Sequence, residues 1–331
     1  MSGRQTHQQL LLATRRSPLA LAQSQMIATA IEHAVSGVHV ALQPMTTQGD
    51  VILDRPLREV GGKALFTKGV EEAVLTGQAD LAVHSLKDMD TVSPPGLEIV
   101  AYPVRENPHD VIVTPDGCSL EQLAPGAVIG TSGLRRVAQL RAISRQFDLR
   151  PLRGNINSRL AKLDAGEFDA IVLAAAGLKR AGYADRIGQG TLSMTQVLSA
   201  AGQGILAVQM LTDHPLKDVV SKALNHQPTY CQALAERTFL AGIAGNCFSP
   251  VAAYCALNTA DNTATLTAYL APTVLGENRP LSDEALVAAP WRQSLRFETS
   301  PGAAAFQQAG AALARQARTS VPNIFEDWST R

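Results

Sequence analysis

Apolar and polar positions along the chain predict strands and helices in alternation. Short apolar runs of strand length are followed by longer segments in which apolar residues recur with the helical period. Ser17 and Pro18 suit the N-cap and the first position of the first predicted helix. This alternation is typical of α/β units with parallel sheets. Up to residue 174, the predicted strands are 10–14, 38–45, 79–84, 97–104, 111–114, 127–130, 148–152 and 170–174, and the predicted helices are 18–33, 65–75, 135–145 and 157–165.

A third region begins near Gln227. It holds a predicted helix at 230–241, predicted strands at 251–257 and 265–271, and an Ala- and Gln-rich C-terminal stretch that we expect to be helical. In open α/β sheets, ligands bind beyond the carboxyl ends of the strands. The turns that follow the predicted strands are therefore where functional side chains are expected.

The composition argues against several classes of protein. Hydrophobic residues make up 46% of the chain and charged residues 18%, which is the balance of a folded globular protein. The 29 basic and 29 acidic side chains cancel, so no nucleic-acid partner is expected. No apolar run approaches the roughly 18 residues of a membrane span, and the N-terminal residues lack the apolar core of a secretion signal. We expect a cytoplasmic protein that binds no membrane.

Cysteine and histidine usage argues against disulfides and metal sites. Cys118, Cys231, Cys247 and Cys255 form no Cys-x-x-Cys pair, so reduced thiols are expected. The seven histidines are scattered, and no metal site is predicted. Cys247 follows a Gly-Asn turn at 245–246, and it is either a small buried hydrophobe or an accessible loop thiol.

Positive charge is concentrated between residues 130 and 162, where eight basic residues accompany one acid, Asp148. Turns at 130–133 and 153–155 contain small residues, which let backbone N–H groups approach a ligand, and arginine suits carboxylate or phosphate. These turns predict an anion site. A solvated helix face is the alternative, and it is favoured for the other arginines of the segment. The predicted anion-site residues are Arg135, Arg136, Arg153 and Arg159.

Cations also occur in two other turns, at 14–17 and 176–180. One phosphate does not need so many cations, whereas a ligand with several spaced carboxylates does.

Lys87 and Asp88 follow the predicted strand 79–84. Asp88 is either half of a solvated ion pair or a carboxylate that faces a cleft. In the second case it would stabilise a cationic intermediate or transfer a proton. The residues alone leave both interpretations open.

Taken in order, these segments resemble the porphobilinogen deaminases, also called hydroxymethylbilane synthases. The resemblance covers nearly the whole chain, and the joint order of its motifs is very specific. The motifs are Ala13-Thr14-Arg15-Arg16-Ser17-Pro18-Leu19-Ala20, Gly49-Asp50, Gly61-Gly62-Lys63, Leu65-Phe66, Val83-His84-Ser85-Leu86-Lys87-Asp88, Gly130-Thr131-Ser132, Leu134-Arg135-Arg136, Arg153-Gly154-Asn155, Ala174-Ala175-Ala176-Gly177-Leu178, Gly202-Gln203-Gly204 and Cys247.

The resemblance implies an α/β fold with two lobes like those of periplasmic binding proteins around a cleft, and a smaller α/β or α+β C-terminal domain. The first domain would comprise residues 1–105 and 203–222, the second 106–202 and the third 223–331. A monomer is expected by default.

The implied activity is that of a transferase of tetrapyrrole (haem) biosynthesis. It would join four porphobilinogen molecules head to tail, release four ammonia molecules and give linear hydroxymethylbilane. The implied cofactor is dipyrromethane, held by a thioether to Cys247. Asp88 matches the catalytic aspartate, which would stabilise the azafulvene cation left when ammonia departs. The residues that would bind the cofactor, the substrate and the growing polypyrrole chain are Arg15, Ser17, Lys87, Thr131, Ser132, Arg135, Arg136, Arg153, Arg159 and Arg180.

Five positions depart from the family pattern: Gln48, Asp90, Gly133, Ser199 and Asn246. They bear on turnover rate more than on reaction type. Two other functions remain open. A non-catalytic two-lobed module that binds a dicarboxylate or oxyanion would need neither Asp88 nor Cys247, and an inactive paralogue would keep the cofactor without turnover.

Overall fold

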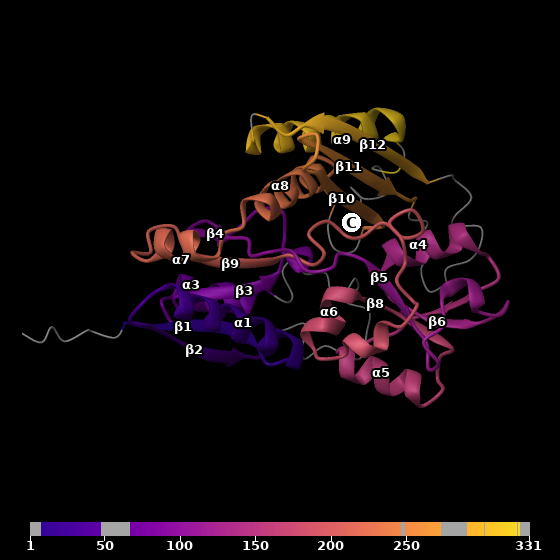
Figure 1. Cartoon of the computed structure of the whole chain (residues 1–331), viewed down its shortest axis with the longest axis horizontal. Coiled ribbons are helices and arrows are strands. Elements are labelled where there is room, and N and C mark those ends of the chain that lie inside the picture. Colours follow the sequence, from indigo (N-terminus) through magenta and orange to yellow (C-terminus); the bar gives the residue numbers. More distant parts are fainter. Residues whose placement is uncertain are drawn as a thin grey trace, which may run out of the picture. The chain divides into compact units, whose positions relative to one another are not determined.

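The computed structural model describes residues 8–47, 67–245, 249–272, 290–300, 302–322 and 324. The chain divides into two compact units, and each is built from two separate segments. Unit 1 comprises Met1–Glu106 and Ile205–Tyr230, and unit 2 comprises Asn107–Gly204 and Cys231–Arg331 (Figure 1). The three-domain division expected above stays a prediction.

Unit 1 is built on a five-stranded mixed sheet with the order β2-β1-β3-β9-β4. β1 runs parallel to both β2 and β3, whereas β9 is antiparallel to β3 and β4. The last segment of unit 1 thus supplies a strand to a sheet made by the first. The strands are β1 (Gln8–Arg15), β2 (Val38–Met45), β3 (Leu81–Ser85), β4 (Leu97–Ala101) and β9 (Leu206–Leu211), and the helices are α1 (Pro18–Ala34), α3 (Lys68–Leu75) and α7 (Lys217–Leu224).

Local signals account for the first βα turn of unit 1. The Ser17 hydroxyl accepts a hydrogen bond from the Ala20 amide at 3.3 Å, and Pro18 occupies the first helical position, as the sequence predicts. Ile27 and Ile31 on the inner face of α1 pack against Leu10 and Leu12 of β1 in the main core of this unit. The buried apolar face therefore holds α1 against the sheet and fixes where β1 ends.

Unit 2 contains a four-stranded sheet with the order β5-β8-β6-β7. β6 runs parallel to β7 and β8, and β5 is antiparallel to β8. The strands are β5 (Asp110–Val113), β6 (Val128–Gly130), β7 (Asp148–Arg150) and β8 (Ala170–Ala174), and the helices are α4 (Leu134–Ile143), α5 (Ile156–Asp164) and α6 (Ala175–Arg180).

A second, fully antiparallel sheet of unit 2 has the order β10-β11-β12. Two long helices accompany it, and at Gly310 they approach closely. A Cβ atom on Gly310 would lie 2.5 Å from the Ala235 carbonyl oxygen. These elements are β10 (Val251–Asn258), β11 (Thr263–Leu270), β12 (Trp291–Glu298), α8 (Gln227–Gly242) and α9 (Ala303–Ser320).

Glu236 joins this part of unit 2 to the segment that leads back to unit 1. Its carboxylate is fully buried and accepts hydrogen bonds from the amides of Gly202 at 2.7 Å and Cys255 at 2.8 Å. The turn at 200–204 is therefore held from α8 and β10.

The mixed α/β fold confirms the class predicted from sequence, and every predicted strand has a counterpart. The expectation of parallel sheets is wrong in part, because β9 and β5 run antiparallel and the third sheet is wholly antiparallel. The prediction did not include β9, β12, α6 or α7. Residues 65–66 of the predicted helix 65–75 lie outside the described residues.

Candidate functional site

Four of the predicted site residues lie at one edge of the unit 1 sheet. Because β1 and β3 are parallel neighbours, their carboxyl ends meet at the same edge. Arg15 ends β1, and Ser17 is the N-cap of α1. Lys87 and Asp88 form the 3₁₀ turn η1 (Leu86–Asp88) directly after β3, where Asp88 is exposed and Lys87 is half-buried. The structure thus places a carboxylate and two cations at the edge where ligands of α/β sheets bind.

Hydrogen bonds with α1, with β9 and with the residue before β9 fix the end of β3. The Gln23 side-chain amide of α1 donates to the Ser85 hydroxyl at 3.1 Å, and the Leu86 amide donates to the Ile205 carbonyl at 3.0 Å. His84 Nε2 lies 3.0 Å from the side-chain oxygen of Gln209 on β9. The turn that carries Asp88 is therefore braced on both sides.

Behind that turn, His84, Gln209 and Glu71 form a buried polar chain. The His84 Nε2–H donates to Gln209, whose amide nitrogen donates to the Glu71 carboxylate at 3.3 Å. The exposed fractions of the three residues are 6%, 0% and 7%. Burial lowers the pKa of His84 to about 4, and the nearby Arg15 charge acts in the same direction. Burial also raises the pKa of Glu71. His84 is neutral at pH 7.

The predicted residues of unit 2 also share one edge. They follow the carboxyl ends of β6, β7 and β8, which run parallel. Thr131 and Ser132 come after β6, Arg153 after β7, and Arg180 at the end of α6 after β8. Arg135 and Arg136 occupy the first turn of α4. The structure therefore brings these residues to one edge of the sheet, and their role as a binding site stays a prediction.

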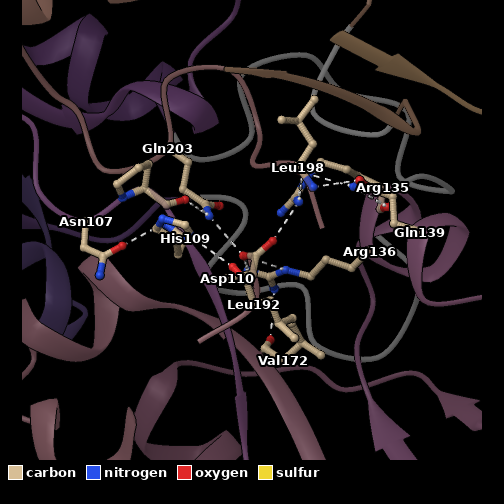
Figure 2. Close-up of polar contacts among 11 residues, drawn as sticks. Asn107, His109, Asp110, Arg135, Arg136, Gln139, Val172, Leu192, Leu198 and Gln203 are labelled. Carbon is tan, nitrogen blue, oxygen red and sulfur yellow. Dashed lines mark hydrogen bonds and ion pairs between the residues drawn. The ribbon is translucent and has the colours of Figure 1, made fainter. Parts of the chain in front are cut away.

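Arg135 and Arg136 converge on one carboxylate, that of Asp110 (Figure 2). Asp110 is the first residue of β5 and is 0% exposed. Its Oδ1 accepts from Arg136 Nη2 at 2.7 Å and Nε at 3.2 Å, and its Oδ2 lies 2.7 Å from Arg135 Nη1. Both arginine side chains are about nine-tenths buried, with exposed fractions of 9% and 11%. Two cations and one anion are thus buried together.

Backbone carbonyls and two glutamines complete this cluster. Arg136 Nη1 donates to the Val172 carbonyl at 3.0 Å, and Arg135 Nη1 donates to the Leu198 carbonyl at 2.6 Å. The Gln139 side chain pairs with both backbone groups of Leu198 at 2.7 and 3.0 Å. Gln203 Nε2 donates to Asp110 Oδ1 at 3.0 Å and to the Pro108 carbonyl at 2.8 Å.

The electrostatics of the cluster follow from this geometry. Burial alone would raise the pKa of Asp110, but the two guanidinium groups hold that pKa well below its usual range. Burial lowers the pKa of Arg135, although arginine remains protonated. The cluster therefore carries one net positive charge in a buried place. Such a charge favours an anion nearby, because isolated buried charges are costly.

The remaining predicted residues have different surroundings. The Ser132 hydroxyl bridges both backbone groups of Leu152, at 2.8 and 3.0 Å. Arg159 Nε donates to the Gly154 carbonyl at 2.8 Å, and Arg180 Nη2 donates to the Gly204 carbonyl at 2.7 Å. Thr131 is 3% exposed, and its Oγ1 has no hydrogen-bond partner among the described residues.

Several predicted positions lie outside the described residues, among them Cys247, Gln48 and Asn246. Of the other departures from the family pattern, Gly133 is the N-cap of α4, and a Cβ there would meet only Arg136 Cδ, at 3.9 Å. Ser199 is fully buried, and its hydroxyl has no partner among the described residues. Nothing in the structure explains Asp90.

Two features are absent from the described residues. They contain no group of three or more His, Cys, Asp or Glu side chains that could hold a metal ion. In the part of the chain that the structure describes, no helix is long and apolar enough to cross a bilayer. Cys118 is half-buried, and Cys231 and Cys255 are buried.

Sequence reasoning missed Asp110, Gln203 and Glu236 as polar partners. Gln203 belongs to a motif that the resemblance includes, so it could have been singled out. No local sequence pattern marks Asp110 or Glu236 as a site residue, because the partners of each are distant in the sequence and come close only in the folded protein.

Comparison with known proteins identifies the family of this chain. The family model described as porphobilinogen deaminase, dipyromethane cofactor binding domain, matches residues 10–217. A porphobilinogen deaminase from Chromobacterium violaceum is 46% identical over 257 residues, which cover 78% of this chain and 82% of that protein.

Similar solved structures include a putative methionine-binding lipoprotein from Bacillus subtilis, with a TM-score of 0.42, 10% identity and coverage of 67% of this chain and 92% of that chain. A nutrient-binding protein from Burkholderia cenocepacia bound to methionine has a TM-score of 0.41 and 12% identity, with coverage of 65% and 90%. Similarity this low adds nothing to the assignment, which the sequence matches carry. Because the family model spans more than half of the sequence and the relative is so similar over most of both proteins, this chain belongs to the porphobilinogen deaminase family.

Proposed function

We infer that the chain catalyses the reaction of its family, the stepwise head-to-tail condensation of four porphobilinogen molecules to linear hydroxymethylbilane, with loss of four ammonia molecules. It is thus a transferase of tetrapyrrole biosynthesis. In the structure, the observation that carries this inference is the buried net positive charge of Arg135, Arg136 and Asp110 at the ligand-binding edge of unit 2. A chain of pyrroles with acetate and propionate groups supplies the anions that such a site favours.

The residues of this edge fit the family's dipyrromethane cofactor. Its carboxylates would meet the excess charge of the arginine cluster, and the buried Thr131 hydroxyl has a hydrogen bond to give. Arg153, Arg159 and Arg180 lie at the same edge and would bind further carboxylates, whereas the Ser132 hydroxyl already donates to the Leu152 carbonyl and would hold the turn in shape. We assign the thioether to Cys247. When bound, the cofactor supplies the pyrrole carbon to which the first substrate is joined.

In unit 1, we assign the chemistry to Asp88, with Arg15, Ser17 and Lys87 as binding groups for the acidic side chains of the substrate. Asp88 lies exposed in a turn braced by the end of β3. Its carboxylate would accept hydrogen bonds from pyrrole N–H groups and stabilise the cation formed on the substrate when ammonia leaves. At about 4 Å and an effective dielectric constant of about 20, the attraction is roughly 4 kcal/mol. We further propose that the protein acts as a cytoplasmic monomer.

Intact mass under denaturing conditions tests the cofactor assignment. The expected result is an added mass of two porphobilinogens less two ammonia molecules, present in the wild type and lost in Cys247→Ala. A protein that stays at its bare mass after incubation with porphobilinogen or hydroxymethylbilane would favour a non-catalytic anion-binding module.

Asp88→Asn separates an enzyme from a binding module or an inactive paralogue. The expected result is loss of bilane production with the cofactor still attached, because asparagine keeps the shape and removes the charge. Asp90→Asn, two residues along the same loop, is the matched control and should retain turnover. Equal bilane production by Asp88→Asn and the wild type would refute the role of Asp88.

A further inference from the structure

The two neighbouring arginines of α4 use their guanidinium groups differently. Arg136 directs its Nε and Nη2 atoms, the edge that binds a carboxylate bidentately, to Asp110 Oδ1. Its third contact, from Nη1, is to the Val172 carbonyl. The carboxylate-binding edge of Arg136 is therefore already occupied by the protein itself.

Arg135 has the opposite arrangement (Figure 2). Its Nη1 faces both the Leu198 carbonyl at 2.6 Å and Asp110 Oδ2 at 2.7 Å. Among the described residues, its Nε and Nη2 atoms donate to nothing. The bidentate edge of Arg135 is thus left for an anion, while its Nη1 corner is fixed.

The balance of charges also indicates that Arg135 and Arg136 have different roles. One carboxylate neutralises one of two guanidinium groups, so the cluster retains a single positive charge. One further carboxylate balances it, and a second would have no cation of this pair to face. Asp110 is fully buried, and the two guanidinium groups hold its pKa well below its usual range, so it is ionised at neutral pH.

Gln203 holds Asp110 in this role. Its amide nitrogen bonds both Asp110 Oδ1 and the Pro108 carbonyl two residues before it. The carboxylate is thereby tied to the backbone of its own segment as well as to the arginines. The orientation of this carboxylate therefore depends on partners from α4 and from the turn at 200–204.

We propose that Asp110 is a positioning residue. It binds the Nε–Nη2 edge of Arg136, and it orients Arg135 so that the Nε–Nη2 edge of Arg135 faces one carboxylate of the bound pyrrole chain. Arg135 is then the binding residue of the pair, and Arg136 acts on the ligand only through Asp110. This inference rests on the proposed function, and it alters the expectation that both arginines bind the acidic side chains directly.

The first experiment compares Arg135→Lys with Arg136→Lys in the full-length protein. Lysine keeps the charge but cannot present two parallel donors. The KM for porphobilinogen should rise at least tenfold in Arg135→Lys, with little change in the midpoint of thermal unfolding. Arg136→Lys should lower that midpoint and change KM less than threefold. Asp164→Asn, which breaks the peripheral pair with Arg186, is the control and should alter KM in neither direction.

The second experiment tests whether Asp110 acts through Arg135. Asp110→Asn should raise KM, and the double variant Asp110→Asn/Arg135→Lys should have a KM no higher than that of Arg135→Lys alone. Gln203→Met, which keeps every charge and removes the amide donor, serves if Asp110→Asn does not fold, and it should raise KM several-fold.

The outcomes are distinguishable from failure of the proposed function. If the wild type makes no bilane, the function itself is wrong. If the wild type is active, equal rises in KM for the two lysine variants overturn the division of roles. Multiplicative effects of Asp110→Asn and Arg135→Lys, or an unchanged KM in Gln203→Met, overturn the positioning role of Asp110.

Discussion

Replacing His84 by glutamine should remove a pH dependence of stability that this buried histidine imposes on unit 1. His84 is neutral in the folded protein and donates its Nε2–H to Gln209. Its pKa is 6.5 when unfolded and about 4 when folded. The unfolded chain therefore takes up a proton that the folded chain refuses between these values, and stability falls as the pH falls.

The size of the effect follows from the same two values. The whole difference corresponds to about 3 kcal/mol, since one pKa unit is worth about 1.4 kcal/mol. The loss begins as the pH falls below 6.5 and is complete near pH 4. Glutamine retains an N–H donor for Gln209 and does not titrate, so the variant should lack this loss.

The measurement is the free energy of unfolding by urea at half-unit steps from pH 7.5 to 4. Burial also raises the pKa of Glu71, but this carboxyl group is present in both proteins. The difference between wild type and His84→Gln isolates His84. Parallel curves would show that His84 takes up a proton in the folded state, and would refute the argument from burial.

Three other changes should alter stability by amounts that denaturant unfolding can measure. Ser199→Ala should stabilise by about 1 kcal/mol, because it removes a buried hydroxyl with no partner among the described residues; a loss would mean that the hydroxyl is satisfied. Glu236→Gln should destabilise by about 1–3 kcal/mol, because an amide has one oxygen for the two N–H groups that the carboxylate receives; the exposed Glu167→Gln is its control. Gly310→Ala should destabilise by about 1–3 kcal/mol, since its Cβ would lie 2.5 Å from the Ala235 carbonyl oxygen, and wild-type stability would show that the helices separate easily.

The elements that the sequence predicted well are those whose signal is local. A capping serine with a proline after it, a helical period and an apolar run each depend on neighbours within a few residues, and α1, β2 and β8 were placed almost to the residue. The strand β9 has an equally apolar sequence, but its meaning depends on β3 and β4, which lie more than a hundred residues earlier. Periodicity does not encode which distant strands pair, or in which direction.

The same distinction explains what charge counting revealed about the site. Between residues 130 and 162, the surplus of arginine pointed to the edge of the sheet where the turns after parallel strands converge. The count treated Arg135 and Arg136 as equivalent, since it included no acid that distinguishes them. Asp110 lies twenty residues outside that window and reaches the pair only because β5 runs antiparallel to β8, which brings its first residue to the edge where β8 ends. The antiparallel direction of β5 therefore places Asp110 against Arg136 and leaves the Nε–Nη2 edge of Arg135 for a ligand. The different roles proposed for the two arginines thus follow from the topology of the sheet.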